Sequence, residues 1–181
     1  MGTAVGLMTV EEFRRLPERE DVQLELRAGE VVAVTRPKKR HDDCVYRMNR
    51  WLMPLVDAIG RLEREFSYRA LPEYELRVAD LAYVPWDRWD AVDEDDNLHG
   101  APDFAVEVAS PSNSAEELLE RRDLCLDNGC TEFWIVYPKL KKVAVSTQQG
   151  EKTYRSGDVI PFTVFSGHSM PVDAIFTTPR R

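Results

Sequence analysis

Residues 101–138 read APDFAVEVASPSNSAEELLERRDLCLDNGCTEFWIVYP, and most of the fold prediction rests on them. The pattern predicts an apolar strand that carries two acids, a polar turn, a helix and a second apolar strand. Asp103 and Glu107 are four residues apart, so they project from the same face of the first strand. Carboxylates on an apolar segment are costly unless a metal, a basic group or water pairs with them. The stretch therefore predicts either a metal and phosphate site or a solvated strand end.

The helix within this stretch can supply a basic partner for the acids. Ser114 and Glu117 have capping-box spacing, which predicts that the helix begins directly after Ser114. Arg121 and Arg122 follow about two turns later, where the helix folds back over the strand that it left. The apolar positions define a helix face centred on Arg122, with Arg121 on its flank. Either arginine is therefore a candidate to reach the carboxylates.

The composition predicts one soluble domain over residues 1–181. The chain has 181 residues, of which 43% are hydrophobic and 31% charged, enough for one α/β or α+β core and too few for two. The three cysteines show no zinc-ligand spacing. No basic leader precedes an apolar run, and no apolar stretch reaches the roughly 18 residues that a membrane span needs. We expect a cytoplasmic protein that does not contact membranes.

The net charge of −8 argues against a nucleic-acid partner unless the charge is unevenly distributed. Six of the 32 acids fall within residues 87–96, which we interpret as a solvated loop. Lys38, Lys39 and Arg40 instead form a basic run. This run predicts a local basic edge on an otherwise acidic protein.

Two predicted elements precede this basic run. Thr9 and Glu12 have capping-box spacing, which predicts a short N-terminal helix. Residues 22–35 alternate in polarity around an Ala-Gly turn, as expected of a β-hairpin. Glu25 interrupts the apolar face of this hairpin, so it is either an edge residue or a site residue.

The rest of the chain adds one long helix, a strand-like region and a tail. Apolar residues at helical spacing predict a helix over residues 41–59, kinked at Pro54. Residues 62–84 are strand-like, and Asp80 stands between apolar neighbours there. A hairpin is predicted around residues 148–150, followed by an irregular tail.

Acids thus interrupt apolar strands at Asp80, Asp103 and Glu107, and also at Glu25. Carboxylates converging at the ends of neighbouring strands form a hard-oxygen site of the kind that binds Mg²⁺ or Mn²⁺. Such an ion polarises a phosphate and activates water. Spacing by itself favours the simpler interpretation, in which the acids lie at exposed strand ends.

Several strings match a known family in order and approximate spacing. They are LELRAGEVV, a helix opened by His41, RVADLAYVP, APDFAVEVASPSN and ELLERRDLCLDNGCTEFWIVYP. Together they resemble the Uma family of restriction-endonuclease-like proteins, in the PD-(D/E)XK nuclease superfamily, over nearly the whole chain. The resemblance implies an α/β fold with a restriction-endonuclease-like core: a central mixed β-sheet flanked by α-helices, with the N-terminal helix and hairpin added. It also implies a divalent-metal site.

The resemblance assigns roles to the acids. Asp80 matches the first acid of the superfamily motif, although Ala79 stands where the family usually has proline. Glu107 matches the second acid. Asp103 is implied as a supporting metal ligand or a structural acid. Glu25 matches a hairpin glutamate that can complete the metal shell or position water.

The catalytic lysine of the superfamily has no match in this chain. The position two residues after the second acid is Ala109, and the family's alternative position on the helix, eight residues before Gly129, is Arg121. Arginine keeps the positive charge and can bind phosphate through two hydrogen bonds, but it is a poor proton acceptor. Arg121 therefore suffices if the lysine only holds phosphate, and activity falls if the lysine must orient or deprotonate water.

The sequence thus predicts an endonuclease that uses Mg²⁺ or Mn²⁺ to hydrolyse nucleic-acid phosphodiester bonds. DNA is the expected substrate and a homodimer the expected assembly. Candidate contacts to nucleic acid are Lys38, Lys39, Arg40, His41 and Arg122. For His41, an ordinary surface histidine is the favoured alternative. A catalytically impaired nuclease fold, acting as a nucleic-acid-binding or protein-interaction module, is the competing hypothesis, and Arg121, Ala79 and the net charge favour it.

Overall fold

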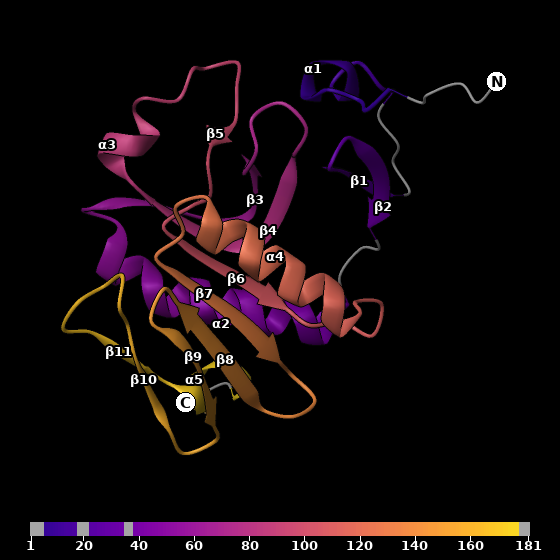
Figure 1. Ribbon diagram of the computed structural model, residues 1–181. Coiled ribbons are helices and arrows are strands. Elements are labelled where there is room, and N and C mark those ends of the chain that lie inside the picture. The colour runs from indigo at the N-terminus through magenta and orange to yellow at the C-terminus, as the bar shows by residue number, and fades with distance from the viewer. Residues whose placement is uncertain (1–5, 18–21, 35–37, 178–181) are drawn as a thin grey trace.

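A mixed seven-stranded sheet forms the centre of the computed structural model, which describes residues 6–17, 22–34 and 38–177. The strand order is β5-β3-β4-β6-β7-β8-β9, in which β6 is antiparallel to β4 and parallel to β7 (Figure 1). The strands are β3 (Gly60–Arg69), β4 (Arg77–Pro85), β5 (Leu98–His99), β6 (Phe104–Val108), β7 (Glu132–Tyr137), β8 (Lys142–Thr147) and β9 (Gly150–Arg155). This arrangement confirms the predicted α/β fold class.

Two helices cover opposite faces of the central sheet (Figure 1). Helix α2 (Lys39–Val56) packs Val45, Met48 and Leu52 into one core cluster. Helix α4 (Ala115–Asp127) packs Leu118 and Cys125 into the other. Because α4 connects the parallel strands β6 and β7, it must cross over one face of the sheet. The two helices therefore approach β4 and β6 from opposite sides.

The predicted capping box at the start of α4 is confirmed, but the prediction of which helix face is buried is wrong. Ser114 and Glu117 form both hydrogen bonds of a capping box. The buried face consists of Leu118, Arg121 and Cys125, while Leu119 is 41% exposed. The face is thus centred near Arg121 and not on Arg122.

The N-terminal hairpin forms a separate two-stranded sheet of β1 (Gln23–Arg27) and β2 (Glu30–Val34). Its turn requires positive φ at Ala28 (46°) and Gly29 (77°), and a Cβ on Gly29 would lie 2.6 Å from Leu7 Cβ. Backbone hydrogen bonds in both directions between Leu26 and Leu76 dock the hairpin beside β4. The short helix α1 (Val10–Phe13) has the predicted capping box at Thr9.

Three expectations about the remaining segments need correction. Helix α2 begins and ends earlier than residues 41–59, with Pro54 inside its last turn. The acidic segment is not a simple solvated loop, because it contains α3 (Trp86–Trp89) and because Arg69 binds Asp96 at 2.9 Å. The tail is not irregular, since it forms β10 (Val159–Pro161), β11 (Ser169–Pro171) and α5 (Val172–Phe176). Its residues Phe162, Phe165 and Ile175 complete the core on the α2 side.

Among the described residues, no helix has both the length and the apolar character that crossing a bilayer requires.

Candidate active site

The candidate site lies where β4 and β6 stop pairing. Their antiparallel register reaches Leu81 opposite Val106, and one further step would place Asp80 opposite Glu107. Directly opposed residues have Cβ atoms about 4.5–5.5 Å apart. Instead of another backbone pair, the Val108 N–H donates to Asp80 Oδ2 at 2.6 Å. The side chain of Asp80 thus bridges the two strands. The two predicted acids lie at the same edge, near enough for the charge of Asp80 to act on Glu107.

Glu107 is the more buried of these two acids. Arg121 Nη1 donates to Glu107 Oε1 and to the Val78 carbonyl, each at 3.2 Å. Only 6% of Glu107 is exposed. Burial raises the pKa of Glu107 to about 8, and the negative charges of Asp80 and Glu25 add to this increase while Arg121 opposes it. A second positive charge beside this carboxyl would favour its ionised form.

Arg121 joins Glu107 to the hairpin glutamate. Its Nη2 donates to Glu25 Oε2 at 2.5 Å, and both side chains are almost completely buried. Burial acts to lower the pKa of Arg121, but Glu107 and Glu25 together raise it above its ordinary value. Arg121 therefore stays charged and cannot accept a proton. Of the two candidate arginines, Arg121 is therefore the one that reaches the strand acids. Arg122 instead pairs with Asp123 and Glu151 on the surface.

Glu25 serves as an anchor for arginines. Its Oε2 also accepts a hydrogen bond from Arg27 Nε at 2.9 Å, and its Oε1 accepts one from the Val78 N–H at 3.3 Å. Arg27 in turn reaches Glu117 of α4 at 3.1 Å. The prediction overlooked Arg27, although its place two residues after Glu25 on the same strand puts both side chains on one face.

His41 approaches Asp80 from the α2 side of the sheet. Its Nε2 lies 2.9 Å from Asp80 Oδ2, the oxygen that also accepts from Val108. The side chain is 13% exposed, and Nδ1 is a buried atom without a hydrogen-bond partner in the described structure. His41 thus belongs to the site and is not an ordinary surface histidine.

Asp103 is not brought to the other acids. It lies at the opposite end of β6 from Glu107, where Arg88 Nη1 donates to its Oδ2. Four residues of extended strand span about 13 Å. One metal ion therefore does not join Asp103 to Glu107.

The two remaining acids fit a divalent metal in number and chemistry. Among the described residues, the hydrogen bonds to Asp80 use only Oδ2 and those to Glu107 only Oε1. One oxygen of each carboxylate is thus left for another ligand. Throughout the described ranges of the chain, no group of three or more His, Cys, Asp or Glu residues is placed to hold a metal. Two carboxylates suit Mg²⁺, which usually keeps several waters and takes one or two protein carboxylates.

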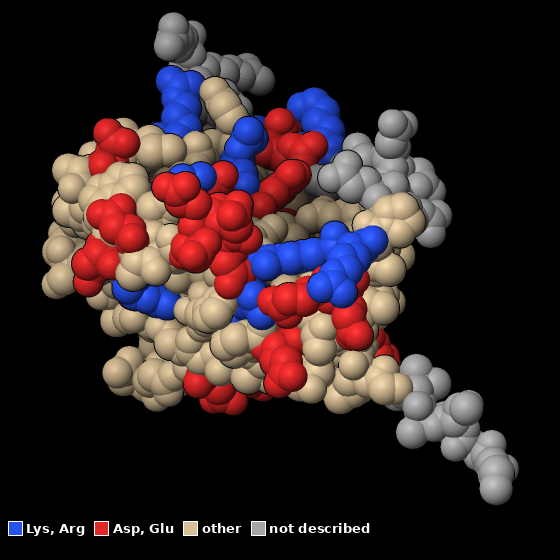
Figure 2. All heavy atoms as spheres, turned by 90° about the horizontal axis from the view of Figure 1, so that it is seen from above, with Lys and Arg blue, Asp and Glu red and all other residues tan. Residues whose placement is uncertain are grey.

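The predicted basic run lies beside this site at the start of α2. Lys38, Lys39 and Arg40 are exposed, and the helix begins at the residue directly after Lys38. Figure 2 shows Lys and Arg side chains interspersed with clusters of Asp and Glu on the face seen from above. On this face, basic side chains therefore lie next to acidic ones.

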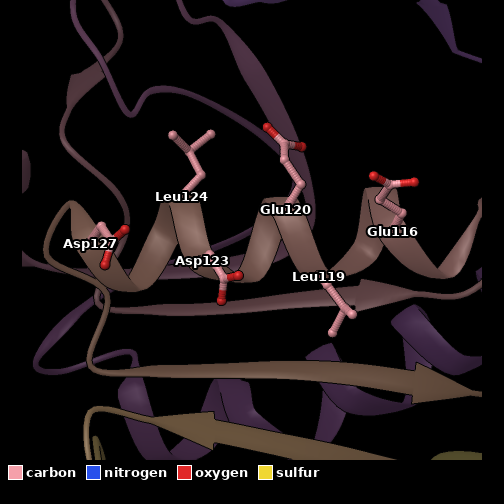
Figure 3. Close-up of a pocket in the computed structure, with 6 residues that line it drawn as sticks. All are labelled: Glu116, Leu119, Glu120, Asp123, Leu124 and Asp127. Atoms are coloured by element: carbon pink, nitrogen blue, oxygen red, sulfur yellow. The ribbon is translucent and has the colours of Figure 1, made fainter.

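An open hollow elsewhere on the molecule does not suit a phosphate. It lies on α4 and is lined by Glu116, Leu119, Glu120, Asp123, Leu124 and Asp127 (Figure 3). Its four acids would repel an anion. The strand edge at Asp80 and Glu107 is therefore the better candidate.

The sheet, the crossover helix and the paired strand-edge acids define an α/β protein with a restriction-endonuclease-like core. The chain belongs to the Uma2 family, described as "Putative restriction endonuclease", whose sequence profile matches residues 10–173. It is similar to the crystal structure of a "putative nuclease belonging to DUF820" from Anabaena variabilis ATCC 29413. The two share 22% identity with a TM-score of 0.80, over 93% of this chain and 97% of that one, and this likeness shows the fold. No curated protein sequence matches the chain.

Proposed function

We propose that the protein is an endonuclease that uses Mg²⁺ or Mn²⁺, held by Asp80 and Glu107, to hydrolyse nucleic-acid phosphodiester bonds. The carrying observation is that Asp80 and Glu107 lie where β4 and β6 part, near enough for the charge of Asp80 to raise the pKa of Glu107. Each has an oxygen that takes no hydrogen bond from the described residues. The described nuclease character of the Uma2 family supports the same conclusion. DNA is the proposed substrate, and a homodimer would place two such sites on the two strands of a duplex.

The residues around the acids have distinct tasks in this proposal. A bound divalent ion supplies polarisation of the phosphate and activation of water. Arg121 holds Glu107 through Oε1 and adds a fixed positive charge next to the site. Because Arg121 stays protonated, the proton from water must pass to another acceptor, such as solvent or the phosphate. Lys38, Lys39 and Arg40 would bind the nucleic-acid backbone.

Cleavage assays with matched variants test this function. Supercoiled plasmid and single-stranded RNA would be incubated with the purified protein in Mg²⁺, in Mn²⁺ or in EDTA. We expect metal-dependent cleavage that Asp80→Asn and Glu107→Gln abolish. Asp103→Asn is the matched control and should retain it. Absence of cleavage with both metals and both substrates, or full activity in Asp80→Asn, would refute the proposal.

A non-catalytic nucleic-acid-binding role is the second candidate, and the Arg121 ion pairs favour it. A permanent cation already lies between Glu25 and Glu107, with distances of 2.5 and 3.2 Å to their oxygens. Comparing Arg121→Lys with the wild-type protein separates the two functions. A large gain of cleavage in the variant would show that the natural site is impaired. Cleavage by the wild-type protein, with comparable or lower activity in the variant, would favour the endonuclease.

A further inference from the structure

Two hydrogen bonds converge on a single oxygen of Asp80. The Val108 N–H and His41 Nε2 lie 2.6 and 2.9 Å from Oδ2, and they come from a strand and a helix. One hydrogen bond would still allow the carboxylate to turn about it. Two donors from different elements fix the carboxylate plane, because rotation would break at least one bond. Oδ1 is thereby left as the oxygen for another ligand.

We infer that His41 is a positioning residue that fixes the Asp80 carboxylate for metal binding and is not a contact to nucleic acid. This inference rests on the proposed metal site. The imidazole donates from Nε2, and a carboxylate oxygen accepts. Outer hydrogen bonds of this kind commonly orient a ligand and raise its affinity for a metal.

The burial of His41 separates it from the neighbouring basic residues. Its side chain is 13% exposed, whereas that of Lys39 is 86% exposed and pairs with Asp43 at 2.9 Å. A phosphate that bound Nε2 would have to displace Asp80, and Nδ1 is itself buried. The geometry thus leaves His41 no exposed nitrogen for a backbone phosphate.

The helix that carries His41 is suited to hold a side chain in a fixed position. It begins at Lys39, and Cys44, Val45 and Met48 in the next two turns are buried in the core. A ligand-orienting group is most effective when it stands on a rigid element. By contrast, Val108 contributes only its backbone N–H, which every side-chain substitution except proline leaves in place. His41 is therefore the member of the pair that mutagenesis can test.

The test measures Mn²⁺ affinity without nucleic acid, by electron paramagnetic resonance of the free ion. We expect His41→Ala to weaken Mn²⁺ binding by about 10- to 100-fold, the range typical of outer-shell partners. His41→Gln should recover much of this loss, because its amide N–H can donate to Asp80. His41→Leu keeps a large side chain but has no hydrogen-bond donor, so it should weaken Mn²⁺ binding as His41→Ala does. It replaces His41→Ala in the test if the alanine variant does not fold. Lys39→Ala is the matched neighbour and should leave Mn²⁺ affinity unchanged.

A second measurement follows the binding of a DNA duplex in EDTA. We expect His41→Ala to bind as tightly as the wild type and Lys39→Ala to bind less tightly. Two results would overturn the inference while leaving the metal site intact. One is an unchanged Mn²⁺ affinity in both His41→Ala and His41→Leu. The other is weaker binding of DNA in EDTA by His41→Ala than by the wild type. No Mn²⁺ binding by the wild-type protein would overturn both the inference and the proposed function.

Discussion

The two ends of strand β6 each carry one acid, and the two acids are neutralised in different ways. At one end, Glu107 is buried and pairs with Arg121, which in turn binds Glu25 of the hairpin. At the other end, Asp103 keeps 22% of its side chain exposed and pairs with Arg88, which follows β4. Glu107 lies within β6 and Asp103 directly precedes its first residue, so the same strand positions both acids. The covering elements, and not the strand, therefore decide which acid becomes part of a buried charge network.

The energetic consequence differs between the two ends. A buried cation that holds two buried carboxylates cannot be removed without leaving uncompensated charge in a low-dielectric environment. A partly exposed pair can exchange its partner for water at little cost. The Glu107 end should accordingly be intolerant of single charge changes, and the Asp103 end tolerant.

The largest expected effect is at Arg121. Substitution Arg121→Ala leaves Glu25 and Glu107 without their shared partner and should lower the free energy of unfolding by about 3–5 kcal/mol. Arg122→Ala on the same helix removes a surface pair and should cost less than about 1 kcal/mol. Urea unfolding followed by circular dichroism measures both. Equal losses in the two variants would contradict the proposed difference in burial.

An intermediate, pH-dependent effect is expected at Asp96, in the segment that leads into the Asp103 end. Desolvation acts to raise its pKa, but hydrogen bonds from Arg69 and Arg14 and from the Asn97 N–H hold the pKa well below its ordinary 3.8. Because the folded state binds the proton less readily, the stabilisation is complete above about pH 4 and is lost as the pH falls further.

Asp96→Asn tests this dependence. Charge-assisted hydrogen bonds contribute about 1.5–3 kcal/mol, and partial exposure favours the lower end, so we expect a loss near 1.5 kcal/mol at pH 7. Urea unfolding at pH 7, 4 and 3 should show the difference from the wild type shrinking toward acid. A difference that stays constant over this range would mean that the carboxylate charge contributes nothing.

A smaller effect than at Arg121 or Asp96 is expected at Arg88. Arg88→Ala removes the pair with Asp103 and the hydrogen bond to the Ala101 carbonyl, and should cost about 1 kcal/mol, since both partners are partly exposed. If the two ends of β6 are independent, Mn²⁺ affinity should not change. A weakened Mn²⁺ affinity in this variant would show that the two ends are coupled.

The sequence predicts those parts of the fold that local signals determine. The capping boxes at Thr9 and Ser114 and the Ala28–Gly29 turn appear where their spacing places them. The meeting of Asp80 and Glu107 follows from the family resemblance, and the strand register supplies its physical basis. Short-range patterns suffice for the caps and the turn because each of these depends on neighbouring residues alone.

Long-range partners could not be predicted in the same way. Hydrophobic periodicity treats Leu119 as core and Arg121 as a flank, whereas Leu119 is exposed and Arg121 buried. Arg121 can be buried only because Glu25 and Glu107, on two other elements, neutralise it. Similarly, Asp103 finds Arg88 in a segment predicted to be a solvated loop. A pattern within one segment contains no information about charges supplied by another.

The ion pair between Glu25 and Arg121 joins residues that are 96 positions apart. During synthesis, the hairpin, β4 and β6 leave the ribosome before the helix that neutralises their acids. Closing a loop of this length is entropically costly and slow compared with forming local turns. Glu25 and Glu107 therefore lack their arginine partner until α4 has been synthesised. The site is complete only after most of the chain exists. A nascent chain surrounded by ribosomal RNA would not yet carry the arrangement on which the proposed cleavage depends.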